Sequence, residues 1–312
     1  MKFDFRSILR SYGIFIAFIL LCIVISVLSP VFLTLTNVRN VIRQSSIYGI
    51  MAVGMTFVIL TGGIDLSVGS ILALAGAIAA GSLKAGVNLG LVIVAALAIG
   101  IGCGLVNGLF ITVGGITPFV VTLGMMSIAR GLTLIYTKGY PISGLQESFR
   151  FIGGGDILAI PFPIIVFILT VLIAWAILTQ TRPGRYTYAI GGNEETVKLS
   201  GINSNFYKTI VYIISGIVSA ISALILTSRL NSAEPVAGQG YELDVIAAVV
   251  IGGTSLMGGR GGVWGTLIGA LLIGVINNGM NLLGISPYFQ LVVKGLIIIG
   301  AVLLDRLRQE QA

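Results

Sequence analysis

The sequence predicts an all-α polytopic membrane protein, and three features of its composition carry this prediction. Of the 312 residues, 56% are hydrophobic and 9% are charged, whereas a soluble domain carries about a quarter charged residues. A soluble fold of this length does not hide so much apolar surface. The 43 glycines suit the close approach of helices in lipid. The net charge of +7 fits cations that set membrane topology, so no nucleic-acid partner is expected.

Apolar runs separated by glycine, proline or charge predict about ten transmembrane helices in a single domain, residues 1–312. The first run lacks a small-x-small cleavage site, so we expect it to be retained as a span. Two glycine-rich breaks, 62–70 and 258–265, are either loops or re-entrant segments. The expected spans lie near 13–35, 45–62, 66–83, 88–112, 117–137, 161–180, 206–228, 243–257, 263–284 and 287–304.

Basic residues indicate the orientation of this layout. An even number of spans places both termini on one side, and that side then holds more cations than the other, as expected of the cytoplasmic side. We therefore expect segments 1–12, 181–205 and 305–312 in the cytoplasm. The flanking cations are Lys2, Arg6, Arg10, Arg306 and Arg308.

A polar interval, Arg182 to Asn205, contains a short helix signal. Asn193 can cap the helix, and Glu194 and Glu195 fall in its first turn, where the helix dipole favours negative charge. Gly201 is placed to end it in the left-handed conformation. About two turns are too few for stability alone in water. We interpret this element as the segment that a partner contacts and through which the partner moves the membrane-embedded body.

Four charged residues fall within or at the edge of predicted spans. A bare cation at mid-bilayer is costly and needs a partner or a wet cavity. We therefore expect structural pairing among these residues, with lining of an outer gate as the alternative. They are Arg130, Lys294, Glu242 and Asp244.

Four asparagines recur in the apolar runs: Asn107, Asn277, Asn278 and Asn281. Asn277 and Asn281 are four residues apart and share one helix face. Hydrogen bonding between helices is one interpretation. The other is a polar lining for the path of a sugar-like solute.

The sequence offers no catalytic or metal-binding constellation. Histidine is absent, and the two cysteines, Cys22 and Cys103, lie in separate apolar runs. Asp65 lacks a neighbouring acid, so we expect it to cap the following span with help from Ser67. No Gly-x-x-x-x-Gly-Lys motif occurs in the chain. Neither an enzyme nor an ATP-binding subunit is therefore expected.

A faint internal repeat aligns Ile50–Gly69 with Ile246–Gly265 without gaps. It matches Gly62 with Gly258 and Gly63 with Gly259. Chance in a chain rich in glycine, alanine and valine is one interpretation. Two related halves around a central path, as in many transporters, is the other.

Four segments together resemble the membrane permeases of monosaccharide ATP-binding-cassette importers, of the ribose type within the branched-chain amino acid/monosaccharide permease family. The resemblance covers essentially the whole chain, in order and at compatible spacing. The segments are GGIDLSVGS from Gly62, AIGGNEETVKLSGI from Ala189, GYELDVIAAVVIGGT from Gly240 and NNGMNLLG from Asn277.

This resemblance implies a type II importer fold and a set of partners. Such permeases form dimers in the bacterial cytoplasmic (inner) membrane and dock separate ATPase subunits, which bind ATP and Mg. A periplasmic or lipid-anchored binding protein delivers the monosaccharide. The resemblance also implies that the polar interval supplies the coupling helix, although related loops often carry alanines where this chain has Glu195, Thr196 and Val197. The coupling residues carried over are Gly192, Asn193, Glu194, Glu195, Val197, Leu199, Ser200, Gly201 and Ile202.

Two other classes of function remain as alternatives at this point. An ion-coupled secondary sugar transporter typically needs a titratable carboxylate within its spans, and Asp65 and Asp244 lie at predicted edges. A channel or receptor-like scaffold is the second alternative. Within the importer family, the substrate is D-ribose by overall likeness. Another pentose, a hexose or a furanosyl signalling compound is the alternative substrate.

Overall fold

The computed structural model describes the backbone of residues 5–309 and the side chains of residues 13–303. The cations at both ends that served the orientation argument lie outside the described side chains. The twelve described helices are α1 Phe5–Leu28, α2 Leu35–Leu60, α3 Val68–Lys84, α4 Leu89–Thr112, α5 Pro118–Thr137, α6 Glu147–Gly154, α7 Phe162–Gln180, α8 Arg182–Leu199, α9 Ser204–Leu230, α10 Tyr241–Ile251, α11 Val263–Leu282 and α12 Pro287–Gln309.

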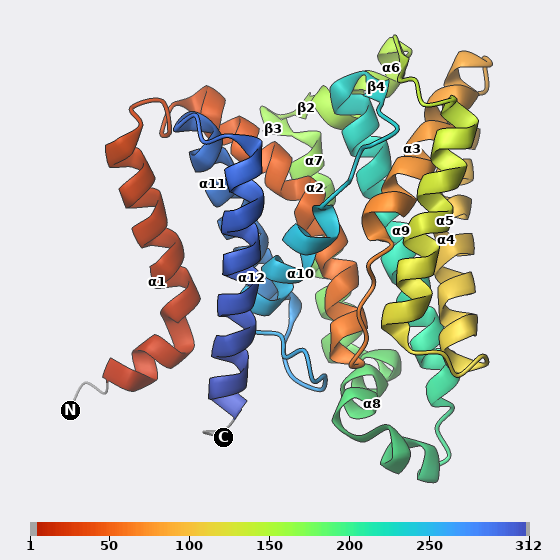
Figure 1. Cartoon of the computed structure of the whole chain (residues 1–312), viewed down its shortest axis with the longest axis vertical. Coiled ribbons are helices and arrows are strands. Elements are labelled where there is room, and N and C mark those ends of the chain that lie inside the picture. Colours follow the sequence, from red (N-terminus) through yellow and green to blue (C-terminus); the bar gives the residue numbers. More distant parts are fainter. Residues whose placement is uncertain (1–4, 310–312) are drawn as a thin grey trace.

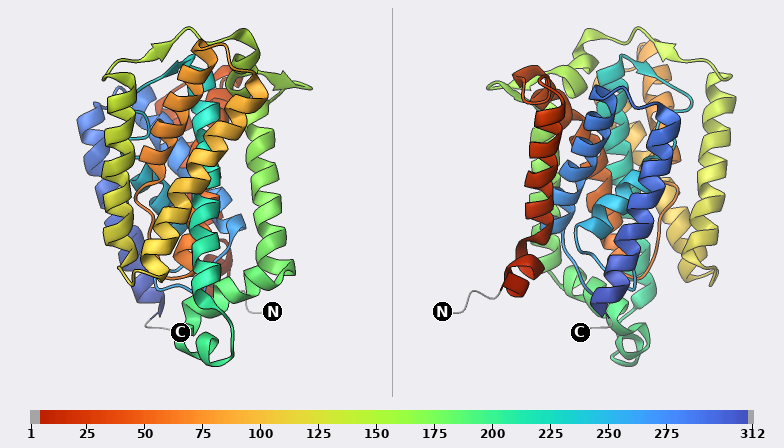
Figure 2. Two further views of the ribbon diagram at one scale, coloured as in Figure 1. Left: turned by 90° about the vertical axis from the view of Figure 1, so that its right-hand side faces the viewer. Right: turned by 60° about the vertical axis from the view of Figure 1, so that its left-hand side comes forward.

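The fold is a helical bundle with two short antiparallel ribbons (Figure 1). Strand β1 (Ile142–Ser143) pairs with β4 (Ser232–Ala233), and β2 (Asp156–Ile157) pairs with β3 (Ile160–Pro161). Both ribbons lie at the end of the bundle opposite α8, as the two views in Figure 2 show. The N-terminal end of α1 and the C-terminal end of α12 lie at the same end of the bundle as α8. The predicted all-α polytopic architecture is thus confirmed.

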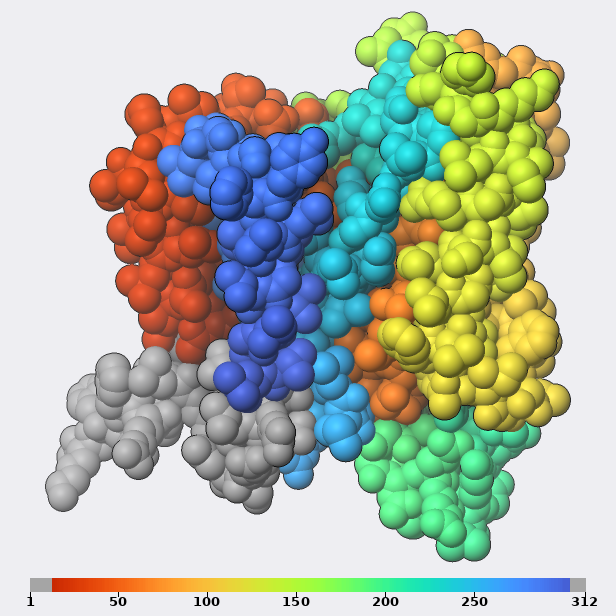
Figure 3. Space-filling model, in the orientation of Figure 1, coloured from red at the N-terminus to blue at the C-terminus, as the bar shows by residue number. Residues whose placement is uncertain are grey.

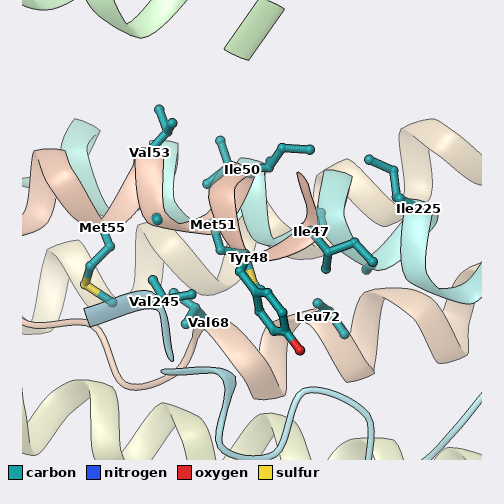
Figure 4. Close-up of a cluster of buried hydrophobic side chains, with 14 of the residues drawn as sticks. Ile47, Tyr48, Ile50, Met51, Val53, Met55, Val68, Leu72, Ile225 and Val245 are labelled. Carbon is teal, nitrogen blue, oxygen red and sulfur yellow. The ribbon is translucent and has the colours of Figure 1, made fainter. Parts of the chain in front are cut away.

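Helices α2 and α9 form the centre of the bundle. In α2, 83% of the most apolar stretch is buried inside the protein, against 22% in α4 and in α5. Figure 4 shows the packing around α2, whose side chains meet α3, α9 and α10. The residues labelled there are Ile47, Tyr48, Ile50, Met51, Val53, Met55, Val68, Leu72, Ile225 and Val245. The outer helices expose apolar faces, as lipid contact requires.

Close glycine contacts join α4 to α9. A Cβ added to Gly100 would lie 2.3 Å from the carbonyl oxygen of Gly216, and one added to Gly216 would lie 2.0 Å from that of Gly100. No side chain fits at either position. The expectation that glycine permits close helix approach is therefore confirmed at this crossing.

Six of the described helices are long and apolar enough to cross a membrane, and three shorter ones are apolar over 10–17 residues. The eighth expected span is different, because α10 contains only 11 residues between extended stretches of chain (Figure 1). Length and composition therefore support several spans, and the number of about ten stays a prediction.

Helix α2 extends well before the expected second span, near 45–62. Helix α2 begins at Leu35, where the Thr34 side chain accepts a hydrogen bond from the Asn37 amide. Arg39 and Arg43 lie on this helix, before the expected span. Arg43 forms an ion pair with Asp156 at 2.7 Å, and Arg39 donates to the carbonyl oxygen of Ala159 at 3.0 Å. The β2–β3 hairpin and the residues beside it provide partners for both arginines. The helix can therefore continue beyond the apolar run.

Candidate functional site

The polar interval folds as two helices joined at Asn193. The Thr181 side chain caps the first helix through the Gly184 amide. Asn193 leaves the helical conformation, with φ −160° and ψ 99°, and its side chain accepts a hydrogen bond from the Thr196 amide at 2.9 Å. The second helix ends at Leu199, and Gly201 takes a φ of +76°. The predicted cap and the predicted left-handed glycine are both confirmed.

Glu194 ties the short second helix to the start of α9. Its carboxylate forms ion pairs with Lys198 at 2.9 Å and Lys208 at 3.0 Å, and it accepts a hydrogen bond from the Ser204 hydroxyl at 3.1 Å. Partial burial by itself raises the pKa of Glu194. The hydrogen bonds from both lysines and the charge of Lys208 outweigh this effect and lower the pKa to about 2. Glu194 is therefore ionised at neutral pH and engaged within the protein.

The second helix presents a distinct outer face. Val197 is 5% exposed and packs against the protein's own body, whereas Leu199 is 84% exposed and Phe206, early in α9, is 57% exposed. Glu195 is exposed and Ile202 is half-buried. The other expected coupling residues are all exposed: Gly192, Asn193, Ser200 and Gly201. Figure 3 shows the α8 element extending beyond the body of the molecule.

Below this face, backbone meets backbone at a set of glycines that we call the glycine junction: Gly62, Gly191, Gly258 and Gly259. The Gly259 amide donates to the carbonyl oxygen of Leu60 at 2.9 Å. A Cβ on Gly191 would lie 1.8 Å from that oxygen and 2.4 Å from the Gly259 nitrogen. The first helix of α8 therefore packs directly on the end of α2 and on the break before α11.

The glycine junction joins the two segments that the sequence alignment matched. A Cβ on Gly258 would lie 3.0 Å from the Gly62 nitrogen and 3.0 Å from the Gly191 Cα. Tyr188 adds a side-chain contact by donating to the Gly261 carbonyl oxygen at 2.9 Å. The matched glycines Gly62 and Gly258 thus lie together, although the origin of the repeat stays untested.

The four expected intramembrane charges lie in two places. Lys294 Nζ contacts Asp244 Oδ2 at 2.8 Å, and the Asp244 side chain is 1% exposed. Arg130 instead donates to the carbonyl oxygens of Pro235 and Ala237 at 2.7 and 2.8 Å. Glu242 forms no ion pair within residues 13–303 and lies beside the backbone of Gly69. Of the four charged residues, Lys294 and Asp244 form an ion pair, and Arg130 is hydrogen-bonded to the loop that contains Pro235 and Ala237.

The four expected asparagines do not surround one cavity. Asn107 donates to the Ser67 hydroxyl at 3.0 Å, in the interior. Asn277 lies on α11 beside Asp244 and Lys294. Asn278 exchanges hydrogen bonds of 2.9 and 3.0 Å with Asn37 of α2. Asn281 accepts from Gln290 of α12 at 2.9 Å. The contacts of Asn278 and Asn281 join helices, and the lining of a solute path stays a prediction.

Asp65 lies in the turn before α3 and is fully buried. One carboxylate oxygen accepts from the Ser67 amide at 2.9 Å and from its hydroxyl at 2.5 Å, and the other accepts from the Ser215 hydroxyl at 2.7 Å. It thus fixes the turn and ties it to α9 instead of capping the first helical amides. No sequence pattern indicates the contact to Ser215, which lies 150 residues away. Within residues 13–303, no group of three or more His, Cys, Asp or Glu side chains is placed to hold a metal ion.

These features define a class of protein: a polytopic membrane transport subunit with broken helices inside and a solvent-facing helical handle at one end. The chain belongs to the family described as "Branched-chain amino acid transport system / permease component", whose model matches residues 37–302. No solved structure matches the chain.

Characterised relatives extend over nearly the whole chain. It is 52% identical to the "Ribose import permease protein RbsC" of Bacillus subtilis over 98% of this chain and 95% of that protein. Identity to the protein of the same name from Escherichia coli K12 is 50%, over 94% and 93% of the two chains. The "D-allose transport system permease protein AlsC" of E. coli K12 is 40% identical over 98% and 94%.

Proposed function

We propose that this chain is the membrane-spanning permease subunit of an ATP-binding-cassette importer that brings D-ribose into a bacterial cell. The observation that carries this proposal is the 50–52% identity to ribose import permeases from two bacteria, over more than nine-tenths of each chain. The 40% identity to a permease for D-allose makes another sugar the second candidate substrate. The site of action is the cytoplasmic (inner) membrane.

The partners follow from this class. A separate ATPase binds ATP and Mg and hydrolyses the nucleotide, a binding protein delivers the sugar from outside, and two copies of the permease form the translocating unit. The outer face of the second helix of α8 is the ATPase contact. Its exposed Leu199, Glu195 and Ser200 support this assignment, and the buried Val197 and engaged Glu194 act from within.

The orientation proposed from the sequence is consistent with this arrangement. The N-terminal end of α1 and the C-terminal end of α12 lie at the α8 end of the bundle (Figure 1), so the proposal assigns α8 and these two helix ends to one side, the cytoplasmic side. The basic side chains around α8 fit the cytoplasmic excess of Lys and Arg. They are Arg182, Arg185, Lys198, Lys208 and Arg260. Counting α10 with its flanking chain as one crossing gives the ten expected spans.

Force from the ATPase reaches the membrane interior through the glycine junction. Movement of α8 presses on the carbonyl end of α2 and on the break before α11, because Gly191 touches Leu60 and Gly259 without intervening side chains. Backbone contacts of this kind transmit small displacements, since no rotamer can absorb them. The two states of the permease then differ in how α2 and α11 are tilted about this point.

The interior charges and amides hold the moving helices in register. The buried Asp244–Lys294 pair joins α10 to α12, and Asn278 joins α11 to α2. Exchange of these contacts between the outward-open and inward-open states gives the sugar a path without a tight binding site. Asn107, Asn277 and Asn281 are candidates for side chains that the sugar meets along this path.

Reconstitution of the permease with its ATPase and binding protein tests the proposal. D-ribose is expected to stimulate ATP hydrolysis and to enter proteoliposomes only with ATP. Stimulation by another sugar but not by ribose would refute the substrate. Uptake driven by a sodium or proton gradient without ATP would refute the class and favour an ion-coupled transporter.

A further inference from the structure

A cavity of about 360 Å³ lies between α1, α2, α7 and α11, and no polar atom is exposed on its wall. Helix α1 packs chiefly on α11 at the edge of the bundle (Figure 1), which leaves a groove toward α2 and α7. We call this the α1 groove. The lining side chains come from four helices and the α1–α2 turn, and six of them define its length: Phe18, Cys22, Val38, Ile168, Leu267 and Val275.

The chemistry of the wall selects an apolar occupant. A sugar or a column of water would leave its hydroxyls without hydrogen-bond partners here, which is unfavourable. The groove borders the exposed apolar faces of α1 and α7, where Leu20, Val24 and Leu172 face outward. In a membrane these faces meet hydrocarbon, so the molecule that reaches the groove is a lipid acyl chain.

The length of the groove matches one leaflet. Leu267 and Val275 of α11 both line it, and eight residues of helix rise about 12 Å. Half of a hydrocarbon core of roughly 30 Å is about 15 Å. A single acyl chain therefore fits along the groove, whereas a cavity of about 360 Å³ is too small to hold a transmembrane helix about 10 Å wide.

Two arginines stand at the end of the groove remote from α8. Arg39 and Arg43 share helix α2 with the lining residue Val38, and both contact a single carboxylate, that of Asp156, at 3.9 and 2.7 Å. The Nε atom of Arg43 is buried and has no hydrogen-bond partner among the described residues. That buried atom is out of reach of a ligand, but two arginines against one carboxylate leave a net positive charge, and the partly exposed guanidinium of Arg39 is open to a phosphate oxygen.

The adjoining hairpin supports a lipid surface at this level. Leu158, at the tip between β2 and β3, is 93% exposed, and the carbonyl oxygen of the next residue, Ala159, accepts from Arg39. The hairpin projects sideways from the bundle (Figure 2). An exposed leucine beside arginines is the arrangement expected at a membrane interface.

We propose that the α1 groove binds one phospholipid, with an acyl chain along α11 and the phosphate at Arg39 and Arg43. The lipid then completes the packing of α1 against the rest of the bundle. This site is separate from the sugar path and from the ATPase contact, so the test of the lipid site does not depend on the proposed function. With α8 in the cytoplasm, the bound lipid belongs to the outer leaflet.

Native mass spectrometry of the purified full chain tests the site, with dioleoyl phosphatidylglycerol as the probe. Ile168→Trp fills the groove, and Ile173→Trp is its control, because both isoleucines are exposed on α7 but only Ile168 lines the groove. We expect one retained lipid in the parent chain and in the control, and at least tenfold less in Ile168→Trp. Size-exclusion chromatography verifies that both variants are folded.

Arg39→Gln tests the phosphate contact, with Arg150→Gln as the control, an exposed arginine on the same side of the bundle. Loss of one charge-assisted contact is expected to weaken lipid retention about tenfold. Equal retention by all variants would overturn the proposal. Displacement of the lipid by inorganic phosphate would reduce the site to an anion site. A change of oligomeric state in Ile168→Trp with lipid retained would assign the groove to a second copy of the chain.

Discussion

A methyl group at Gly191 should break the glycine junction, whereas the same change at the next residue should leave the junction intact. At Gly191 the added carbon would lie 1.8 Å from the Leu60 carbonyl oxygen and 2.4 Å from the Gly259 nitrogen. Both atoms are backbone, so no side chain can rotate away. Gly192 has no atom within 4 Å of an added Cβ, and neither glycine has a positive φ. Gly192→Ala is therefore a matched control.

The magnitude follows from two opposing effects. Alanine in a helix is favoured over glycine by about 0.5–1 kcal/mol, which both variants gain. Overpacking costs typically about 1–3 kcal/mol, and only Gly191→Ala incurs it, together with loss of the Gly259–Leu60 hydrogen bond at about 1 kcal/mol. The two variants should therefore differ in unfolding free energy by about 2–4 kcal/mol.

Two assays separate folding from coupling. Thermal unfolding of the purified permease should show Gly191→Ala below the parent and Gly192→Ala at or above it. In proteoliposomes with the ATPase and binding protein, Gly191→Ala should lose more sugar uptake than ATP hydrolysis, because the ATPase still docks but its movement is no longer transmitted. Equal stability and equal uptake for the two variants would refute the reasoning.

Three further changes have defined outcomes. Because the pKa of Glu194 is lowered from 4.5 to about 2, its stabilising contribution is complete above about pH 4.5 and is lost as the pH falls toward 2; Glu194→Gln should remove about 1 kcal/mol and expose α8 to protease at neutral pH. Glu195→Lys should weaken retention of the ATPase in pull-downs without changing that protease pattern. Asp244→Asn should destabilise the fold by about 3–5 kcal/mol, because it leaves Lys294 without its partner, and Lys294→Met in the same chain should restore much of the loss.

Each of these has a contrary result. Protection of α8 that is equal in Glu194→Gln and the parent would show that its ion pairs do not hold the helix. Unchanged ATPase retention in Glu195→Lys would move the contact toward Leu199. Failure of Lys294→Met to rescue Asp244→Asn would mean that Asp244 has a role beyond pairing.

Local signals were the part of the site that the sequence predicted well. The cap at Asn193, the acidic first turn and Gly201 all act within a few residues, so their pattern was sufficient to place the short helix. Asp244, the partner of Lys294, could also be predicted, because few carboxylates lie within or beside the predicted spans. Contacts with backbone could not be predicted in this way: Arg130 binds two carbonyl oxygens, which every residue carries.

Hydrogen bonds and ion pairs between residues far apart in the sequence explain the remaining differences between prediction and structure. Arg43 meets Asp156 across 113 residues, and Ser222 of α9 donates to the carbonyl oxygen of Ile47 across 175. Such contacts determine how α2 packs, and no pattern near α2 in the sequence indicates them. The glycines of the junction can be found in the sequence. Which backbone segments pack against them cannot be predicted, because this depends on how three distant segments meet.

The shortness of α10 has a consequence for how the chain is made. Eleven residues of helix rise about 16 Å, roughly half of a hydrocarbon core of 30 Å, and the helix carries Glu242 and Asp244 in its first turn. Such a segment cannot leave the insertion machinery for lipid on its own, because the extended chain around it would expose bare amides to hydrocarbon. Helix α10 packs on α2 and α11, one made before it and one after it, so its place in the membrane depends on the folding of the whole bundle.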